Sequence, residues 1–188
     1  MVTKSAPMKS KPKLEAHRLG IPLEALPPID RTPMCLVLDQ VRSAHNTGAV
    51  FRTADAAGLS IVYLVGLTPH PPHPQVEKTA LGGSQYVPWR HRETFEEVES
   101  ELSEADYTLV ALDNGPDAQE LWDFDWPSRP ALVAGNEVDG VSPDVLERCS
   151  LKVCLPMFGY KRSLNVTTAV GIATYDYLRR MKKGAGSE

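Results

Sequence analysis

The sequence predicts an α/β protein with a mostly parallel sheet flanked by helices. Short apolar segments typical of buried strands alternate with longer segments whose apolar residues recur at helical spacing. Three of the apolar segments are followed by polar loops, which begin at residues 39, 135 and 156 and have a glycine in or just after them. Parallel sheets bind ligands outside the carboxyl ends of their strands, so these loops are the predicted ligand site.

The composition indicates a globular chain of one ordinary domain. The chain has 188 residues, of which 42% are hydrophobic and 23% are charged, enough to bury a real core. No apolar run approaches the roughly 20 residues of a membrane span. The N-terminus contains lysines but no apolar signal-peptide segment. We therefore expect a cytoplasmic protein with no membrane partner.

The charge is unevenly distributed along the chain. A net charge of -4 argues against a generally basic nucleic-acid-binding protein. Residues 1–19 carry five basic residues and one acidic residue, so the remaining chain is strongly acidic. We expect residues 1–32, rich in proline and lysine, to form a flexible or loosely docked arm. The arm is either a solubilising tail or a contact for nucleic-acid phosphates, and residues 33–188 form the folded domain.

The histidines and cysteines do not predict a metal site. His70 and His73 are three residues apart in a proline-rich loop without a third ligand nearby, which favours a surface loop. Cys35, Cys149 and Cys154 are odd in number and lack metal-ligand spacing. They are best interpreted as reduced, buried thiols, so no metal is expected.

The first half of the domain is predicted to begin with a strand and a helix. Residues 34–38 form a buried strand, and a helix begins near Asn46 and ends at Gly58, a natural residue after a helix. The buried side of this helix is apolar and consists of Val50, Phe51, Ala54 and Ala57. The next predicted elements are a strand at 61–65, a short helix that residues 78–84 close with glycines, and a short strand at 86–91.

The second half contains two clear helix starts. Thr94 and Glu97 form a capping box, and Ser142 precedes Pro143 as an N-cap. Strands are predicted at 108–112, 131–134 and 151–155. A last helix follows Asn165, which occupies an N-cap position. The irregular segment with Trp122, Phe124 and Trp126 is better explained by core or dimer packing than by base stacking.

Three motifs in the predicted loops resemble those of a known family. The first has Asn46, then Gly48-Ala49 and Arg52-Thr53-Ala54, and the second has Gly135-Asn136-Glu137 before Gly140-Val141-Ser142. The third runs from Pro156 to Val166 as PMFGYKRSLNV. In this order they are similar to the motifs of the SpoU/TrmH-like RNA ribose 2′-O-methyltransferases of the SPOUT superfamily. The resemblance covers about residues 34–181, and we expect no second RNA-binding domain.

The resemblance implies a fold, a cofactor and partners. It implies a C-terminal deep trefoil knot, and S-adenosylmethionine held by backbone at Leu112, Gly135, Leu155 and Leu164. It also implies a homodimer with the active site near the subunit interface. The reaction would be methyl transfer to a ribose 2′-hydroxyl of structured RNA, either tRNA or rRNA, with no DNA partner.

The resemblance also implies polar functional roles for Asn46, Arg52, Glu137, Ser163 and Asn165. By local sequence alone, Asn46 would be a helix cap and Arg52 a solvated helix residue beside Asp55. A guanidinium stays protonated, so Arg52 is a poor general base. Our hypothesis is that Arg52 clamps the RNA phosphate beside the reacting ribose.

Three other functions are compatible with parts of the sequence. One is a non-catalytic RNA-binding module of the same fold, which the five filled polar positions disfavour. Another is a SPOUT relative that methylates a base. The third is an unrelated nucleotide-binding enzyme. Residues 39–48 lack the Gly-x-Gly-x-x-Gly fingerprint, and the chain has neither a P-loop motif nor a Gly-x-Ser-x-Gly elbow, which disfavours that enzyme.

Overall fold

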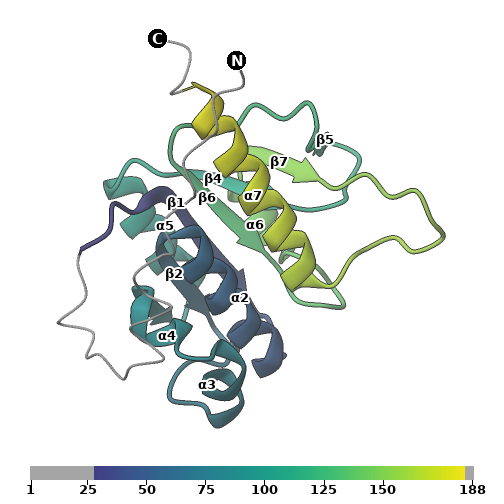
Figure 1. Ribbon diagram of the computed structural model, residues 1–188. Helices are drawn as coiled ribbons and strands as arrows, with labels where there is room; N and C mark the ends of the chain where they lie inside the picture. Colours follow the sequence, from purple (N-terminus) through teal and green to yellow (C-terminus); the bar gives the residue numbers. More distant parts are fainter. Residues whose placement is uncertain (1–27, 185–188) are drawn as a thin grey trace, which may run out of the picture.

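A parallel sheet forms the centre of the molecule (Figure 1). The structure is a computed structural model that describes residues 28–184. Within this range seven strands are ordered β3-β2-β1-β6-β4-β7-β5, and all neighbouring strands are parallel. The strands are β1 (Thr32–Asp39), β2 (Leu59–Val65), β3 (Trp89–Arg92), β4 (Thr108–Leu112), β5 (Gln119–Glu120), β6 (Pro130–Ala134) and β7 (Leu151–Cys154). The predicted α/β class is confirmed.

Helices cover both faces of the sheet. One core cluster joins the sheet to α2 and α7, and a second joins its other face to α5 and α6. The helices are α2 (Ala44–Ala57), α3 (Pro74–Ala80), α4 (Gly83–Tyr86), α5 (Phe95–Glu104), α6 (Pro143–Arg148) and α7 (Val166–Gly184). No helix in the described range is long and apolar enough to cross a membrane. Of the arm predicted for residues 1–32, residues 1–27 lie outside this range.

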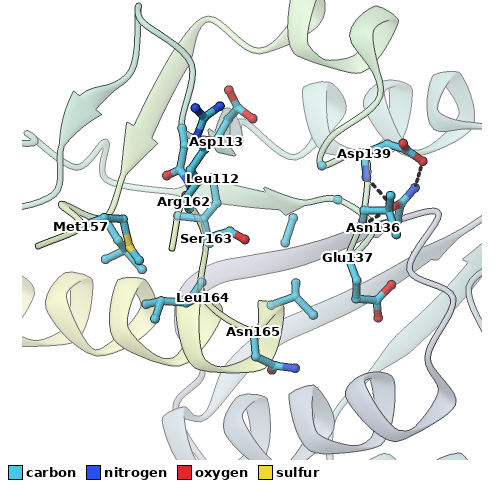
Figure 2. Close-up of a pocket in the computed structure, with 18 residues that line it drawn as sticks. Leu112, Asp113, Asn136, Glu137, Asp139, Met157, Arg162, Ser163, Leu164 and Asn165 are labelled. Atoms are coloured by element: carbon cyan, nitrogen blue, oxygen red, sulfur yellow. Dashed lines mark hydrogen bonds between the residues drawn. The ribbon is translucent and has the colours of Figure 1, made fainter. Parts of the chain in front are cut away.

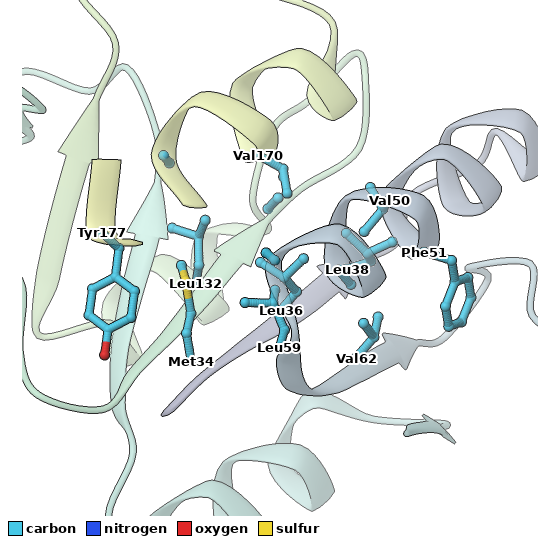
Figure 3. Packing of buried hydrophobic residues seen from close by; sticks show 14 of the residues in the cluster. Met34, Leu36, Leu38, Val50, Phe51, Leu59, Val62, Leu132, Val170 and Tyr177 are labelled. Carbon is cyan, nitrogen blue, oxygen red and sulfur yellow. The ribbon is translucent and has the colours of Figure 1, made fainter. Parts of the chain in front are cut away.

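Alternation along β1 divides the core between the two faces. Met34, Leu36 and Leu38 pack beneath α2 and α7, as Figure 3 shows, whereas Cys35 and Val37 face the α5 side. All five side chains are fully buried. A strand buried on both faces belongs in the middle of a parallel sheet, where its apolar residues contribute about 1.5–3 kcal/mol each.

The helix after β1 begins earlier than predicted. Its N-cap is Ser43, whose Oγ accepts a hydrogen bond from the N–H of Asn46 at 3.2 Å. The interpretation of Asn46 as a cap is therefore wrong, because the better-placed Ser43 hydroxyl satisfies the free N–H groups. As a result, the Asn46 side chain does not cap the helix and is available for contacts with other elements. The predicted end is confirmed, since Gly58 has the left-handed backbone (φ 65°) of a helix C-cap.

Other predicted boundaries differ by one to three residues. β1 begins at Thr32, whose Oγ1 donates a hydrogen bond to the carbonyl of Ala57 at 2.8 Å. β3 spans residues 89–92 instead of 86–91, because α4 extends to Tyr86. The Thr94 capping box is confirmed. These shifts reflect tertiary contacts at element ends, where local sequence signals are weakest.

The aromatic segment after β5 is mainly core, as predicted. Phe124 is buried and meets Trp126 edge to face at 4.9 Å between ring centroids, and Trp126 in turn contacts Tyr177 of α7. Trp122 is about half exposed. The packing of Trp126 against α7 helps hold that helix, and hence its N-terminus, over the sheet.

Candidate functional site

A cavity of about 400 Å³ opens where the carboxyl ends of β4, β6 and β7 meet the start of α7 (Figure 2). The strand order places β6, β4 and β7 side by side, so the loops that follow them converge. The walls comprise residues 112–114, 134–140, 155, 157, 162–166 and 169. All four residues expected to hold a cofactor line the cavity: Leu112, Gly135, Leu155 and Leu164. Their role in cofactor binding stays a prediction.

The loop after β6 is folded tightly against itself. A Cβ added to Gly135 would lie 1.9 Å from the carbonyl carbon and oxygen of Gly140 and 2.1 Å from the nitrogen of Val141. The Asn136 N–H donates to the Gly140 carbonyl at 2.9 Å, and the reverse bond measures 3.1 Å. Only glycine at 135 allows this approach. The loop therefore holds Glu137, at its tip, in one place.

Three predicted functional residues meet beside the cavity. Asn46 Nδ2 donates to Glu137 Oε1 at 2.6 Å, and Asn165 Nδ2 donates to Asn46 Oδ1 at 3.3 Å. Asn165 also caps α7 as predicted, since its Oδ1 accepts from the N–H of Thr167 at 2.9 Å. The Arg42 N–H donates to the second Glu137 oxygen at 3.3 Å. The cluster thus links the loops after β1, β6 and β7.

The hydrogen bonds on Glu137 keep its carboxyl ionised. Partial burial alone would raise the pKa of Glu137, but the hydrogen bond from Asn46 and those from backbone N–H groups, including that of Arg42, outweigh it. The pKa of Glu137 therefore lies below its ordinary value. A carboxylate in this state accepts hydrogen bonds and does not donate a proton at neutral pH.

The two remaining predicted residues differ in position. Ser163 lines the cavity and is exposed. Arg52 is exposed on α2 and is not among the residues that line the cavity. It lies six residues beyond Asn46, which is about 9 Å along the helix and on a different side of it. Within one chain, the structure does not bring Arg52 to the cavity.

Several cavity residues were missed by the sequence interpretation. Asp113, Asp139, Met157 and Arg162 all line the cavity (Figure 2). Asp113 directly follows the predicted strand at 108–112, and a polar residue at that position is itself a signal for a ligand site. With Glu137, the two aspartates add negative charge to a lining of mixed apolar and polar side chains, Arg162 among them. Such a lining suits a ligand with an apolar ring and a positive charge.

The histidines and cysteines take structural positions. His73 caps α3, since its Nδ1 accepts from the N–H of Gln75 at 3.2 Å, and the ring of His70 stacks on Trp89. The three cysteines are free thiols, and burial raises the pKa of Cys149 to about 12. Among residues 28–184 no group of three or more possible metal ligands comes together.

The Ser142 prediction requires one correction. Ser142 precedes α6, but its hydroxyl does not cap that helix. Instead its Oγ and N–H both donate to Oδ2 of buried Asp39, at 2.6 and 2.9 Å. The reason is that β1 pairs with β6, so the Asp39 carboxylate at the end of β1 lies within reach of Ser142 and orients its hydroxyl through a charge-assisted hydrogen bond. This contact fixes the second motif against β1.

The chain is similar to known proteins over most of its length. The model of the SpoU rRNA methylase family matches residues 33–175. The chain is 30% identical over 168 residues to the 23S rRNA (guanosine-2′-O-)-methyltransferase RlmB of Neisseria meningitidis, covering 89% of this chain and 67% of the relative. It is 29% identical over 153 residues to the tRNA (guanosine(18)-2′-O)-methyltransferase of Borreliella burgdorferi, covering 81% of this chain and 69% of the relative.

A solved structure shares the fold. The SpoU methyltransferase AviRb of Streptomyces viridochromogenes, solved in complex with the cofactor AdoMet, superposes with a TM-score of 0.75 at 25% identity. The match covers 82% of this chain but 60% of AviRb. This chain therefore corresponds to about two thirds of the length of such relatives.

Proposed function

Because the chain belongs to the SpoU rRNA methylase family, we propose that it transfers a methyl group from S-adenosylmethionine to a ribose 2′-hydroxyl of tRNA or rRNA. The relatives named above act on both RNA classes, so the class of RNA stays open. The observation that carries the proposal is the Asn46–Glu137–Asn165 cluster on the rim of the cavity. The proposed compartment is the cytoplasm, where tRNA and rRNA function.

The cavity fits the proposed cofactor in size and lining. Its volume of about 400 Å³ is in the range of small-ligand sites. Leu112, Leu155 and Leu164 offer apolar contacts for an adenine ring, and the backbone around Gly135 offers hydrogen-bonding groups. Asp113 and Glu137 supply negative charge near a sulfonium or an amino group. When bound, S-adenosylmethionine supplies a methyl group that is already activated for transfer.

The chain's own residues would then position the acceptor. Asn165 and Ser163 lie at the cavity, where an amide and a hydroxyl can bind ribose oxygens. Glu137 stays ionised and fixes the amide of Asn46, which in turn meets Asn165. Holding two reacting groups in line can account for most of the rate enhancement of a reaction whose leaving group is already activated.

We further propose that the protein is a homodimer and that Arg52 of one subunit serves the cavity of the other. Arg52 is exposed and lies outside the cavity of its own chain. An apolar stripe on α7, formed by Ile172 and Tyr175, is also exposed and suits a subunit contact. At the partner's cavity the Arg52 guanidinium would clamp the phosphate beside the reacting ribose.

The proposed C-terminal trefoil knot would form in the same region. Strand β4 lies between β6 and β7, so the chain crosses β4 between two consecutive strands of the sheet. Threading of the chain through the loop after β4 would produce the knot. Asn114 in that loop donates through Nδ2 to the carbonyl of Arg162 at 2.8 Å, which supports close passage of the two segments.

Methyl transfer tests the activity directly. Purified protein is incubated with labelled S-adenosylmethionine and unmodified total tRNA or rRNA, and the label is assigned to ribose or base after digestion. Ribose label is expected from the wild type and not from Asn165→Ala. Base label would show a base-methylating relative. Binding of S-adenosylmethionine and RNA without any transfer would favour a non-catalytic module of the same fold.

Mixed dimers test the placement of Arg52. Chains with Arg52→Ala and chains with Asn165→Ala are co-expressed with different tags. If Arg52 acts across the interface, one site in each mixed dimer is complete, and the mixture regains about a quarter of wild-type activity. If Arg52 acts within its own chain, no site is complete and activity stays absent. Arg52→Lys with full activity would rule out a bidentate phosphate contact.

A further inference from the structure

The loop between β7 and α7 carries two aromatic side chains that this chain does not cover. Phe158 is 91% exposed and Tyr160 is fully exposed. Figure 1 shows the loop extending away from the body of the molecule. Large aromatic rings normally gain free energy by burial. Two such rings two residues apart therefore indicate a surface that another molecule covers.

The position of these rings relates them to the cavity. Met157 and Arg162, on either side of the aromatic segment, both line the cavity. The carbonyl of Arg162 accepts a hydrogen bond from Asn114 Nδ2 at 2.8 Å, which fastens the end of the segment to the loop after β4. The segment is thus an extension of the cavity rim, next to where an acceptor ribose would enter.

The charge beside the rings indicates what covers them. Lys161 and Arg162 follow directly, and both are exposed. The chain as a whole has a net charge of -4, so this basic pair is opposite in sign to the chain as a whole. Aromatic rings next to lysine and arginine are the surface to which single-stranded nucleic acids bind, through base stacking and phosphate contacts. A second copy of this chain has a net charge of -4 over 188 residues, whereas RNA carries one negative charge for every nucleotide.

We propose that Phe158, Tyr160, Lys161 and Arg162, here called the aromatic–basic segment, bind the unpaired nucleotides that flank the methylated ribose. The two rings stack on bases, and the two cations contact the neighbouring phosphates. Any base can stack on an aromatic ring, so the segment should select unpaired RNA and discriminate little between base sequences. This inference rests on the proposed function, because it assigns the substrate of the same site to single-stranded or looped RNA.

Binding of a short RNA tests the aromatic–basic segment without methyl transfer. The full chain is titrated into a fluorescein-labelled, mixed-sequence RNA of twelve nucleotides, in single-stranded and in duplex form, and anisotropy gives the affinity. Phe158→Ala and Tyr160→Ala should each weaken single-strand binding by about tenfold, as expected for loss of one stacked base. Duplex binding should change little, since paired bases are not free to stack.

Conservative variants separate stacking from general apolar contact. Tyr160→Phe keeps the ring and should keep the affinity, whereas Phe158→Leu keeps apolar area but should weaken binding nearly as much as Phe158→Ala. Trp122→Ala removes a half-exposed aromatic ring outside the segment and serves as the matched control. S-adenosylmethionine affinity should be unchanged in all of these variants, and thermal unfolding should be unchanged in the Phe158 and Tyr160 variants, whose rings are exposed.

Several outcomes would overturn the proposal. It fails if the wild type does not bind the single strand, or if the double variant Phe158→Ala/Tyr160→Ala binds it within twofold of the wild type. It also fails if the double variant changes from dimer to monomer by sedimentation, because a second copy then covers the rings. Methyl transfer by the wild type is measured separately. Strand binding that depends on the two rings but occurs without methyl transfer would refute the proposed activity and leave only the single-strand binding of the segment.

Discussion

Substitution of Gly135 by alanine is expected to disrupt the cavity from within. The new Cβ would lie 1.9 Å from the carbonyl carbon and oxygen of Gly140, where an ordinary contact needs at least 3.4 Å. The neighbouring atoms are backbone, so no side chain can rotate away. The loop must open by roughly 1.5 Å, which strains or breaks the paired hydrogen bonds between Asn136 and Gly140.

The magnitude follows from these two effects. Overpacking of this kind costs about 1–3 kcal/mol. Each of the two backbone hydrogen bonds contributes about 0.5–1.5 kcal/mol. A loss of about 3 kcal/mol in the free energy of unfolding is therefore expected. For a chain of this size, that corresponds to a decrease in Tm of roughly 6–12 °C.

The assay combines thermal unfolding with titration of S-adenosylmethionine. Gly135→Ala should lower Tm as stated and weaken cofactor binding at least tenfold, because the opened loop forms one wall of the cavity. Gly171→Ala is the matched control. Its Cβ would meet no atom within 4 Å, and alanine in a helix should raise stability by about 0.5–1 kcal/mol. A Gly135→Ala protein with wild-type Tm and cofactor affinity would refute the reasoning.

Three further predictions concern contacts between elements. Asn46→Ala should raise the pKa of Glu137 toward its ordinary value and lower the free energy of unfolding by about 1 kcal/mol. The loss is modest because the carboxyl is exposed. Because the pKa of Glu137 is depressed in the folded state, the whole loss should be seen above about pH 5 and should disappear as the pH falls through that pKa. Denaturation of the variant and the wild type at several pH values measures this. Asp176→Asn should lower the free energy of unfolding by about 2 kcal/mol at pH 7 and by little near pH 2. Its carboxylate is 4% exposed, and although burial acts to raise its pKa, hydrogen bonds from two arginines of α7 and from Trp126 lower it. Tyr175→Glu should convert the proposed dimer to monomer in sedimentation, and an unchanged dimer would exclude this stripe as the interface.

Local sequence signals accounted for most of the elements and for some of their ends, but not for the two-residue strand β5. Alternation and helical periodicity gave the strands and helices, because burial of one face imposes those periods on the chain. The capping box at Thr94 and the glycine after α2 marked helix ends for the same local reason. The three motifs also gave the family, which the match over residues 33–175 establishes.

Only the tertiary structure decided which side chains meet. Asn46 is 91 residues from Glu137 and 119 from Asn165 in sequence, and they meet because the strand order puts their loops together. The same strand order brings Asp113 to the cavity, whereas Arg52 stays outside the cavity. Strand order depends on long-range pairing that no local pattern encodes. The residue types of the site can therefore be predicted from the sequence, whereas their contacts come from the folded sheet.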